Sequence, residues 1–306
     1  HKTTLLMGSR FDITVVAMDA KEGDKYIDTA IEEIKRIEKL ISSWDSNSQT
    51  SKINRNAGIQ PVKVDKELFD LISRSIAISS ITDGAFDISY ASIGKIWKFD
   101  GSMTQMPTEQ EIQNSVEKVG YEKIILDSVN HTVFLPQKGM KIDFGAVGKG
   151  YAADKTKKLL MEMGVTAGII NASGDMNTWG KQPDGTEWTV AITNPMNKNT
   201  AFAILPLKQG AVVTSGDYEK YVEFDGIRYA HIINPKTGYP SQGIISVTVF
   251  ASSAELADAL ATSIFVMGIE VGLDRVNQLP NVECIIIDTE GIIYQSQRIK
   301  INEKAN

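Results

Sequence analysis

A single helix in the second half of the sequence places the strongest constraint on the fold. The pattern predicts this helix over 253–267, and its side chains are apolar on nearly every side. A helix of this kind is normally buried, so other elements must surround it. Ser252 and Glu255 have the spacing of a capping box at its start, and Gly268 is typical of a helix end.

Helical and strand patterns alternate along the rest of the chain. Helices are expected at 24–41, 65–81, 108–119, about 150–163 and 270–277. Strands are expected at 10–18, 123–126, 132–135, 140–144, 166–171, 187–193, 201–206, 210–214, 218–224, 227–232, 244–250, 282–287 and 291–296. Residues 42–58 are interpreted as a polar loop, and Thr108 and Glu111 as a capping box.

This order of elements predicts an α+β fold with mixed, largely antiparallel sheets flanked by helices. The chain shows no internal repeat and no Pro, Gly or Ser-rich linker that would divide it. We therefore expect one compact unit over 1–306 with two subregions, roughly 1–140 and 141–306.

The composition excludes some partners and leaves the compartment open. The chain has 306 residues, a net charge of −6 and no Lys or Arg run, which argues against nucleic-acid binding. Cys284 is the only cysteine and lies in an apolar run, which is typical of a small buried side chain. No segment approaches the roughly 20 apolar residues of a membrane-spanning helix. The start at His1 is compatible with a removed signal segment.

Two polar residues interrupt the apolar helix one turn apart. Asp258 and Thr262 share a face, and a buried carboxylate is unfavourable unless it is paired or bound to metal. Stacked oxygen donors suit Mg²⁺, which takes few protein ligands and completes its shell with phosphates and water. The alternative is an Asp that is solvated or hydrogen-bonded and has no metal.

A glycine-rich segment, 143–154, joins a predicted strand to a predicted helix. Backbone amides in such a loop can approach phosphate, and Lys149 adds a positive charge there. The spacing is not that of a P-loop. Residues 148–153 fit the weak pattern G-x-G-x-x-A, although Asn171 occupies the place of the acidic residue that usually follows. An ordinary strand-to-helix turn is the alternative interpretation.

Four further segments contain groups that could act on a ligand. Residues 171–175 and 214–218 combine small residues with Gly and Asp at strand ends, which indicates either ordinary turns or one polar site. His231 follows a strand and could contact phosphate or transfer a proton, or serve only a structural role. In 83–87, Phe86 could pack beside a flat ring while Asp87 or a backbone group accepts a hydrogen bond from it; the alternative is an ordinary loop.

Taken together, these segments resemble the ApbE family of FAD:protein FMN transferases over nearly the whole chain. The matching segments are Met7–Phe11, Ser43–Ser48, Gly84–Asp87, Asp143–Ala153, Ser173–Asp175, Thr214–Tyr218, His231–Pro240 and Ala257–Thr262. The resemblance implies an ApbE-like, T-fold-like domain. Ser9, Trp44, Ala172 and Ser173 depart from the residues that are commoner at these positions in the family.

The resemblance also implies the ligands of the site. Mg²⁺ is expected on Asp258, Thr262 and the carbonyl of Ala146. Contacts with FAD are expected from Met7, Trp44, Ala85, Phe86, Asp87, Asp143, Lys149 and Ile232.

The implied reaction is transfer of FMN from FAD to a Thr or Ser hydroxyl of an acceptor protein, with release of AMP. Lys149 is expected to hold phosphate oxygens, and His231 or Asp217 to activate the acceptor hydroxyl. The nearest alternative is a Mg²⁺-dependent FAD pyrophosphatase, in which water replaces that hydroxyl. A flavin carrier or an NAD-type oxidoreductase using 148–153 would instead be metal-independent.

By the same resemblance, the acceptor is a respiratory or redox membrane protein with a short Thr/Ser motif. The protein itself is expected to be exported, periplasmic or membrane-anchored as a lipoprotein.

Overall fold

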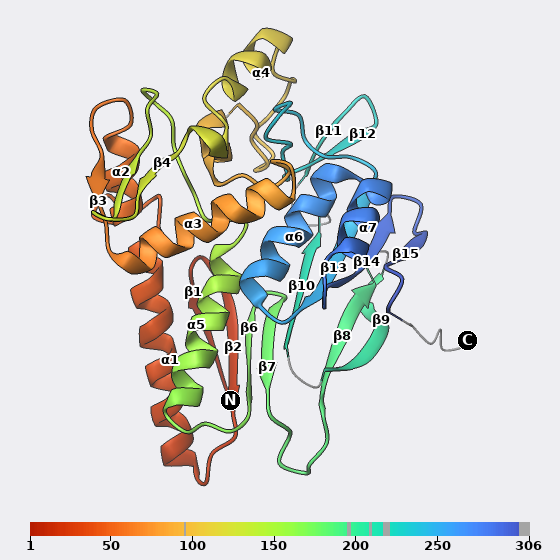
Figure 1. The fold of residues 1–306 in the computed structure, drawn as a ribbon. Helices are drawn as coiled ribbons and strands as arrows, with labels where there is room; N and C mark the ends of the chain where they lie inside the picture. Colours follow the sequence, from red (N-terminus) through yellow and green to blue (C-terminus); the bar gives the residue numbers. More distant parts are fainter. Residues whose placement is uncertain (95, 195–196, 208–209, 217–220, 300–306) are drawn as a thin grey trace.

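An eight-stranded sheet forms the centre of the molecule (Figure 1). The computed structural model describes residues 1–299 except 95, 195–196, 208–209 and 217–220. The strand order is β1-β2-β6-β7-β10-β13-β14-β15, and every neighbouring pair is antiparallel. The strands span Lys2–Leu6, Ser9–Val15, Gly168–Ala172, Asp175–Trp179, Gly210–Gly216, Ile244–Ala251, Glu283–Asp288 and Ile293–Gln295 in that order. The predicted α+β class with largely antiparallel sheets is confirmed.

Helices pack on this sheet along its length (Figure 1). They are α1 (Ala20–Ile41) on β1 and β2, α5 (Gly148–Glu162) on β6 and β7, α6 (Ala254–Met267) on β10 and β13, and α7 (Ile269–Gln278) on β14. Helix α6 also contacts α5 and α7, so it is enclosed on several sides. Leu260 and Ile264 on α6 are fully buried, which confirms the expectation of a buried helix.

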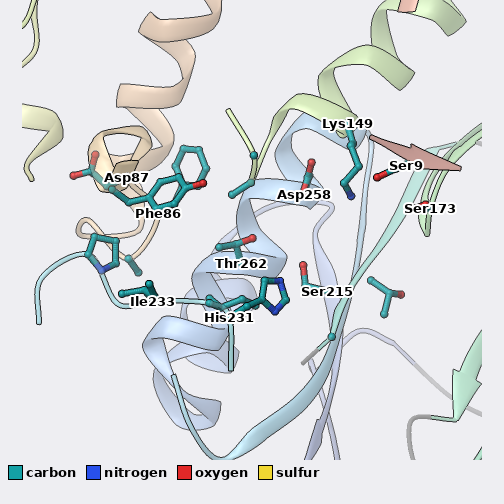
Figure 2. Close-up of a pocket in the computed structure, with 18 residues that line it drawn as sticks. Ser9, Phe86, Asp87, Lys149, Ser173, Ser215, His231, Ile233, Asp258 and Thr262 are labelled. Atoms are coloured by element: carbon teal, nitrogen blue, oxygen red, sulfur yellow. The ribbon is translucent and has the colours of Figure 1, made fainter. Parts of the chain in front are cut away.

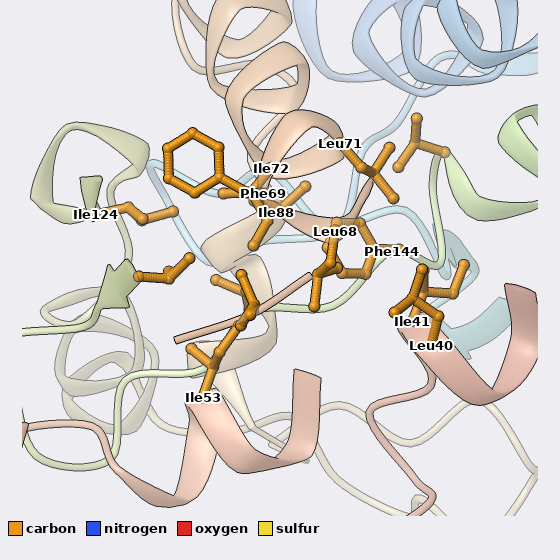
Figure 3. Close-up of a cluster of buried hydrophobic side chains, with 14 of the residues drawn as sticks. Leu40, Ile41, Ile53, Leu68, Phe69, Leu71, Ile72, Ile88, Ile124 and Phe144 are labelled. Atoms are coloured by element: carbon orange, nitrogen blue, oxygen red, sulfur yellow. The ribbon is translucent and has the colours of Figure 1, made fainter. Parts of the chain in front are cut away.

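A second layer lies across the ends of α1 and α5. Its longest element is α3 (Lys66–Ile81), whose Leu68, Leu71 and Ile72 are fully buried (Figure 3). The same apolar cluster includes Phe144 from the loop before α5. Other elements here are α2 (Gln49–Arg55), β3 (Val62–Lys63), η1 (Ile88–Ile93), α4 (Glu109–Val116), η2 (Tyr121–Lys123), β4 (Ile125–Asp127) and β5 (Thr132–Phe134).

Two hairpins extend from the central sheet region. They are β8 (Trp188–Asn194) with β9 (Asn197–Leu207), and β11 (Tyr221–Phe224) with β12 (Ile227–Ala230). The indole of Trp188 donates a hydrogen bond of 3.0 Å to the carbonyl of Trp179, which ties the first hairpin to the end of β7. Among the described residues, no helix is long and apolar enough to cross a lipid bilayer.

The expected loop at 42–58 is wrong in part, because α2 lies within it. Ser48 caps this helix by accepting a hydrogen bond from the amide of Ser51, and the fully buried Thr50 reaches the carbonyl of Leu40. Helix α2 is short and rich in polar residues. Its burial depends on packing that sequence periodicity does not reveal.

The expected strand at 140–144 is also wrong. Its backbone amides do not pair with a neighbouring strand. The amide of Lys141 donates to the hydroxyl of Ser92, and the amide of Ile142 donates to the side chain of Asn54. The amide of Asp143 donates to the carbonyl of Ile88. The segment is therefore an extended connection that leads into the loop before α5.

The two predicted capping boxes have different outcomes. Thr108 and Glu111 form one at the start of α4, as expected. At α6 the capping residue is Ser253, whose hydroxyl accepts from the amide of Leu256, so the expected capping role of Ser252 is wrong.

Candidate active site

A cavity of about 630 Å³ opens where the loop before α5, helix α6 and the ends of several strands meet (Figure 2). This volume falls within the roughly 300–1,000 Å³ that is typical of small-molecule sites. Its lining residues are Ser9, Ala85, Phe86, Asp87, Tyr90, Gly145, Ala146, Lys149, Ser173, Thr214, Ser215, Gly216, His231, Ile232, Ile233, Pro235, Asp258 and Thr262. Segments that are far apart in the sequence thus share one cavity.

Asp258 and Thr262 from α6 both line this cavity, as their spacing of one helical turn predicts. Asp258 is only 3 % exposed, and its Oδ2 accepts a hydrogen bond of 3.1 Å from the amide of Gly150. A β-carbon on Gly150 would lie 2.2 Å from the carbonyl oxygen of Ala254. The absence of a side chain there lets α5 approach α6 closely enough for the hydrogen bond to form.

Lys149 lies in the first turn of α5, beside Asp258 (Figure 2). Val147 precedes this helix without a side-chain cap, and Gly145 and Ala146 line the cavity just before it. A helix N-terminus presents backbone amides and a partial positive charge. Together with the ammonium of Lys149, this end of the cavity suits a phosphate group.

Lys149 also forms an ion pair with Asp175, the first residue of β7. Asp175 is 1 % exposed, and its carboxylate interacts with both Lys149 and Asp258. Burial, followed by the charge of Asp258, raises the pKa of Asp175, and Lys149 offsets only part of this rise. Burial raises the pKa of Asp258 as well.

The charges in this cluster are therefore unevenly balanced. Although burial alone would lower the pKa of Lys149, the carboxylates of Asp175 and Asp258 raise it above its ordinary value. One ammonium faces two buried carboxylates that share a hydrogen bond, and the repulsion between close carboxylates is relieved when one of them takes up a proton or when a further cation binds. A divalent cation would supply positive charge here.

The donor set at this point fits Mg²⁺. Asp258 provides a carboxylate and Thr262 a hydroxyl, and Ala146 lines the same cavity. Within the described residues no group of three or more His, Cys, Asp or Glu side chains is arranged to hold a metal. A carboxylate and a hydroxyl are hard oxygen donors of the kind that Mg²⁺ takes, with water and substrate phosphates completing its shell.

An apolar wall formed by Ala85, Phe86 and Ile232 lies on another side of the cavity. Phe86 is buried between the end of α3 and η1 and faces the cavity opposite Lys149 (Figure 2). The Asp87 carboxylate accepts hydrogen bonds from the amides of Ser89 and Tyr121, so it holds the loop in place. Burial raises the pKa of Asp87.

Hydroxyl groups at strand ends form the remaining wall. Ser9 begins β2, Ser173 lies in the turn between β6 and β7, and Thr214 and Ser215 lie near the end of β10. Ser173 adopts a φ of +54°, which is unusual for a residue other than glycine or asparagine. Its hydroxyl donates a 3.1 Å hydrogen bond to the carbonyl of Arg10, which joins the turn to β2.

His231 lies at the edge of the cavity near Thr262 and Ser215 (Figure 2). Its ring meets the edge of Phe99 at a centroid distance of 6.4 Å. The other residue considered for proton transfer, Asp217, lies outside the described residues.

Three residues expected to contact FAD do not line the cavity. Asp143 lies behind the lining residues Tyr90 and Gly145. Its carboxylate accepts hydrogen bonds from the hydroxyl of Tyr90 and the amide of Gly145. Met7 packs against the apolar clusters, and Trp44 is 81 % exposed. Their contacts with FAD stay predictions, as do those of the residues that line the cavity.

Sequence reasoning did not select Asp175 as a site residue. The sequence pattern places Asp175 at the end of a small, glycine-containing turn that indicates either an ordinary turn or part of one polar site, and gives this residue no role of its own. The available signal was that a second carboxylate follows a strand beside the segment that contains Lys149.

Comparisons with known proteins identify the family of this chain. The family model of the ApbE family matches residues 7–286. The chain belongs to the ApbE family. The predicted resemblance is thereby confirmed.

Solved structures of ApbE proteins share the fold of this chain. An ApbE protein from Thermotoga maritima superposes with a TM-score of 0.89 at 32 % identity, over 97 % of this chain and 96 % of that one. A flavin transferase ApbE from Vibrio cholerae superposes with a TM-score of 0.86 at 25 % identity, over 97 % and 96 % of the two chains.

Curated relatives in the ApbE family carry the name FAD:protein FMN transferase. One from Klebsiella pneumoniae (strain 342) is 32 % identical over 88 % of this chain and 84 % of its own length. One from Escherichia coli (strain K12) is 29 % identical over 86 % and 77 %. The prediction that this ApbE chain is a transferase enzyme is confirmed.

Proposed function

We propose that this protein transfers FMN from FAD to a Thr or Ser hydroxyl of an acceptor protein in a Mg²⁺-dependent reaction. The observation that carries the proposal is the cluster at the N-terminus of α5, where Lys149, Asp258 and Thr262 line one cavity and the buried Asp175 pairs with Lys149. The names of the curated relatives support FAD as donor and a protein as acceptor.

Different surfaces of the cavity can bind the rings and the phosphates of a dinucleotide. Phe86 and Ile232 offer apolar surface to a flat ring, and Lys149 with the amides at the start of α5 can bind phosphate oxygens. Asp258, Thr262 and the carbonyl of Ala146 would hold Mg²⁺, which neutralises charge that develops on the leaving phosphate.

In the proposed step the acceptor oxygen attacks the phosphorus of the FMN half. A P–O bond to the acceptor forms, the P–O bond to the AMP half breaks, and AMP leaves with the bond electrons. The hydroxyl proton passes to a base, for which His231 is the candidate within the described residues. Lys149 stabilises negative charge on the phosphate oxygens throughout.

The proposal is tested by incubating FAD and Mg²⁺ with an acceptor protein that contains a Thr/Ser flavinylation motif. Flavin fluorescence on the acceptor in a denaturing gel, lost with EDTA and with a Thr→Ala acceptor, is the expected result. Asp258→Ala should abolish labelling while circular dichroism stays unchanged. Asp274→Ala, which alters an exposed carboxylate on α7, is the matched control and should label normally.

Two results would contradict the proposal. Equal amounts of free FMN and AMP without labelling, with or without acceptor, would assign FAD hydrolysis instead. Full labelling by the Asp258→Ala variant would contradict the proposal that Asp258 binds Mg²⁺.

The setting of the reaction is also part of the proposal. A respiratory or redox membrane protein is the expected acceptor, and an exported or membrane-anchored location would bring the enzyme to it. Fractionation of cells that produce the natural protein tests this, and recovery of all the enzyme in the cytosol would contradict it.

A further inference from the structure

Asp154, which lies outside the cavity on the second turn of α5, connects three elements of the fold. Its Oδ1 accepts hydrogen bonds from the amide of Ala254, at 2.9 Å, and from the side chain of Asn177. Its Oδ2 accepts from the hydroxyl of Ser253, at 2.7 Å, and from the amide of Glu255, at 2.9 Å. One carboxylate on α5 thus binds the start of α6 and the middle of β7.

The chemistry of this junction requires a carboxylate. Each oxygen of Asp154 has two donors, and an ionised carboxylate accepts at both of its oxygens. The negative charge also lies at the N-terminus of α6, where the helix dipole favours it. An amide in its place would direct an N–H group at N–H or O–H donors.

The orientation of Asn177 is fixed from the other side. Lys157 lies on α5, three residues after Asp154. It donates to the Oδ1 of Asn177 at 2.8 Å and to the carbonyl of Thr178 at 2.9 Å. Because the amide oxygen of Asn177 is occupied by Lys157, its amide nitrogen is turned towards Asp154.

The three elements that meet at Asp154 each carry one charged member of the active-site cluster. Lys149 is on α5, Asp175 is on β7 and Asp258 is on α6. Asp175 and Asn177 are two residues apart on β7, so both point to the same side of the strand. Figure 1 shows α5 and α6 side by side over this part of the sheet.

We infer that Asp154 is a positioning residue for the metal and phosphate cluster. By fixing the start of α6 and the middle of β7 relative to α5, it sets the separation of Lys149, Asp175 and Asp258. This inference rests on the proposed function, because it concerns how the same site binds Mg²⁺. Residues that orient metal ligands typically change metal affinity by about 10–100-fold when replaced.

Asp154→Asn tests the inference with two readouts. We expect the Mg²⁺ concentration for half-maximal FMN transfer to rise about tenfold. At saturating Mg²⁺, kcat should stay within about twofold of wild type, because the groups that contact the substrate are all present. Calorimetric titration of the FAD-free protein with Mg²⁺ should show the same loss of affinity.

The matched control is Arg74→Gln. Arg74 donates to both carboxylate oxygens of Glu255, at 2.8 and 3.0 Å, and so ties the same end of α6 to α3 rather than to α5 and β7. The Arg74→Gln substitution should lower the melting temperature but leave the Mg²⁺ requirement for FMN transfer unchanged. Ser253→Ala removes one of the donors to Asp154 and should raise the requirement by a smaller factor, which keeps the test valid if Asp154→Asn does not fold.

The outcomes separate the inference from the proposed function. Equal Mg²⁺ requirements for wild type, Asp154→Asn and Ser253→Ala would overturn the positioning role while FMN transfer stands. If the Mg²⁺ requirement of Arg74→Gln rose as much as that of Asp154→Asn, the effect would be a general loosening of α6. That result would also overturn the inference. Wild-type protein that neither binds Mg²⁺ nor transfers FMN would overturn both.

Discussion

The ammonium of Lys149 pairs with the carboxylate of Asp175, which starts a strand 26 residues further along the chain. Asp175 is almost fully buried, whereas Lys149 reaches the cavity. The pair thereby holds a positive charge at a fixed place beside the start of α5. Asp258 lies close enough to raise the pKa of Lys149 as well.

Replacement of either member of this pair should reduce transfer, and the two effects should overlap. We expect Asp175→Asn to lower kcat/KM about 10²-fold and Lys149→Met by a similar or larger factor, because charge stabilisation at phosphate depends on Lys149. The double variant should be little worse than the poorer single variant. Steady-state kinetics with FAD checks this, and strictly additive losses would show that the residues act independently.

Asp258→Asn should stabilise the metal-free protein while it removes Mg²⁺ binding. The change relieves repulsion between two buried carboxylates that share one ammonium, and the amide oxygen can still accept from Gly150. The expected gain in unfolding free energy is about 1 kcal/mol without Mg²⁺. Thermal melts with EDTA and with Mg²⁺ measure it. A lower melting temperature than wild type in EDTA would contradict the charge imbalance.

Gly150→Ala should be strongly destabilising. The added β-carbon would lie 2.2 Å from the carbonyl oxygen of Ala254, so α5 and α6 would have to separate. We expect a loss of about 3 kcal/mol and no measurable transfer. The control is Gly23→Ala in α1, where the nearest atom is the β-carbon of Ala17 at 3.6 Å, an ordinary contact. Urea unfolding of both variants decides, and similar midpoints would contradict the close approach of the two helices.

Glu67 should contribute to stability in a pH-dependent way. Although burial alone would raise it, hydrogen bonds from Arg36 and Tyr151 lower the pKa of Glu67 from 4.5 to about 2. A lowered native pKa means that the contribution is complete above pH 4.5 and is lost as the pH falls towards 2. Solvent screening reduces it to about 1–2 kcal/mol at pH 7.

Comparison of Glu67→Gln with wild type by urea unfolding at pH 7 and pH 3 checks this contribution. The difference at pH 3 should be less than half of that at pH 7. Glu32→Gln, which alters an exposed pair with Lys35, should show little difference at either pH. A Glu67→Gln difference that stays constant between the two values would contradict the assigned pKa.

Much of the candidate site could be predicted because its residues follow local rules. Asp258 and Thr262 stand out on an apolar helix, and Lys149 stands out in a glycine-rich loop that begins a helix. These signals depend on neighbours within one turn of chain. The structure places all three on one cavity.

The parts that could not be predicted depend on contacts between distant segments. Asp175 joins the cluster because β7 pairs between β6 and β10, and Asp154 acquires its partners because α6 begins beside α5. The burial of Thr50 in α2 has the same origin. Periodicity within a segment contains no information on which elements become neighbours in space.

The apolar wall and the ionic cluster of the cavity come from different segments of the sequence. Ala85 and Phe86 of the apolar wall come from the connection between α3 and η1, whereas the ionic cluster comes from α5, β7 and α6. On the proposed function, substitutions in that short connection are expected to alter ring binding without changing the groups proposed to bind phosphate.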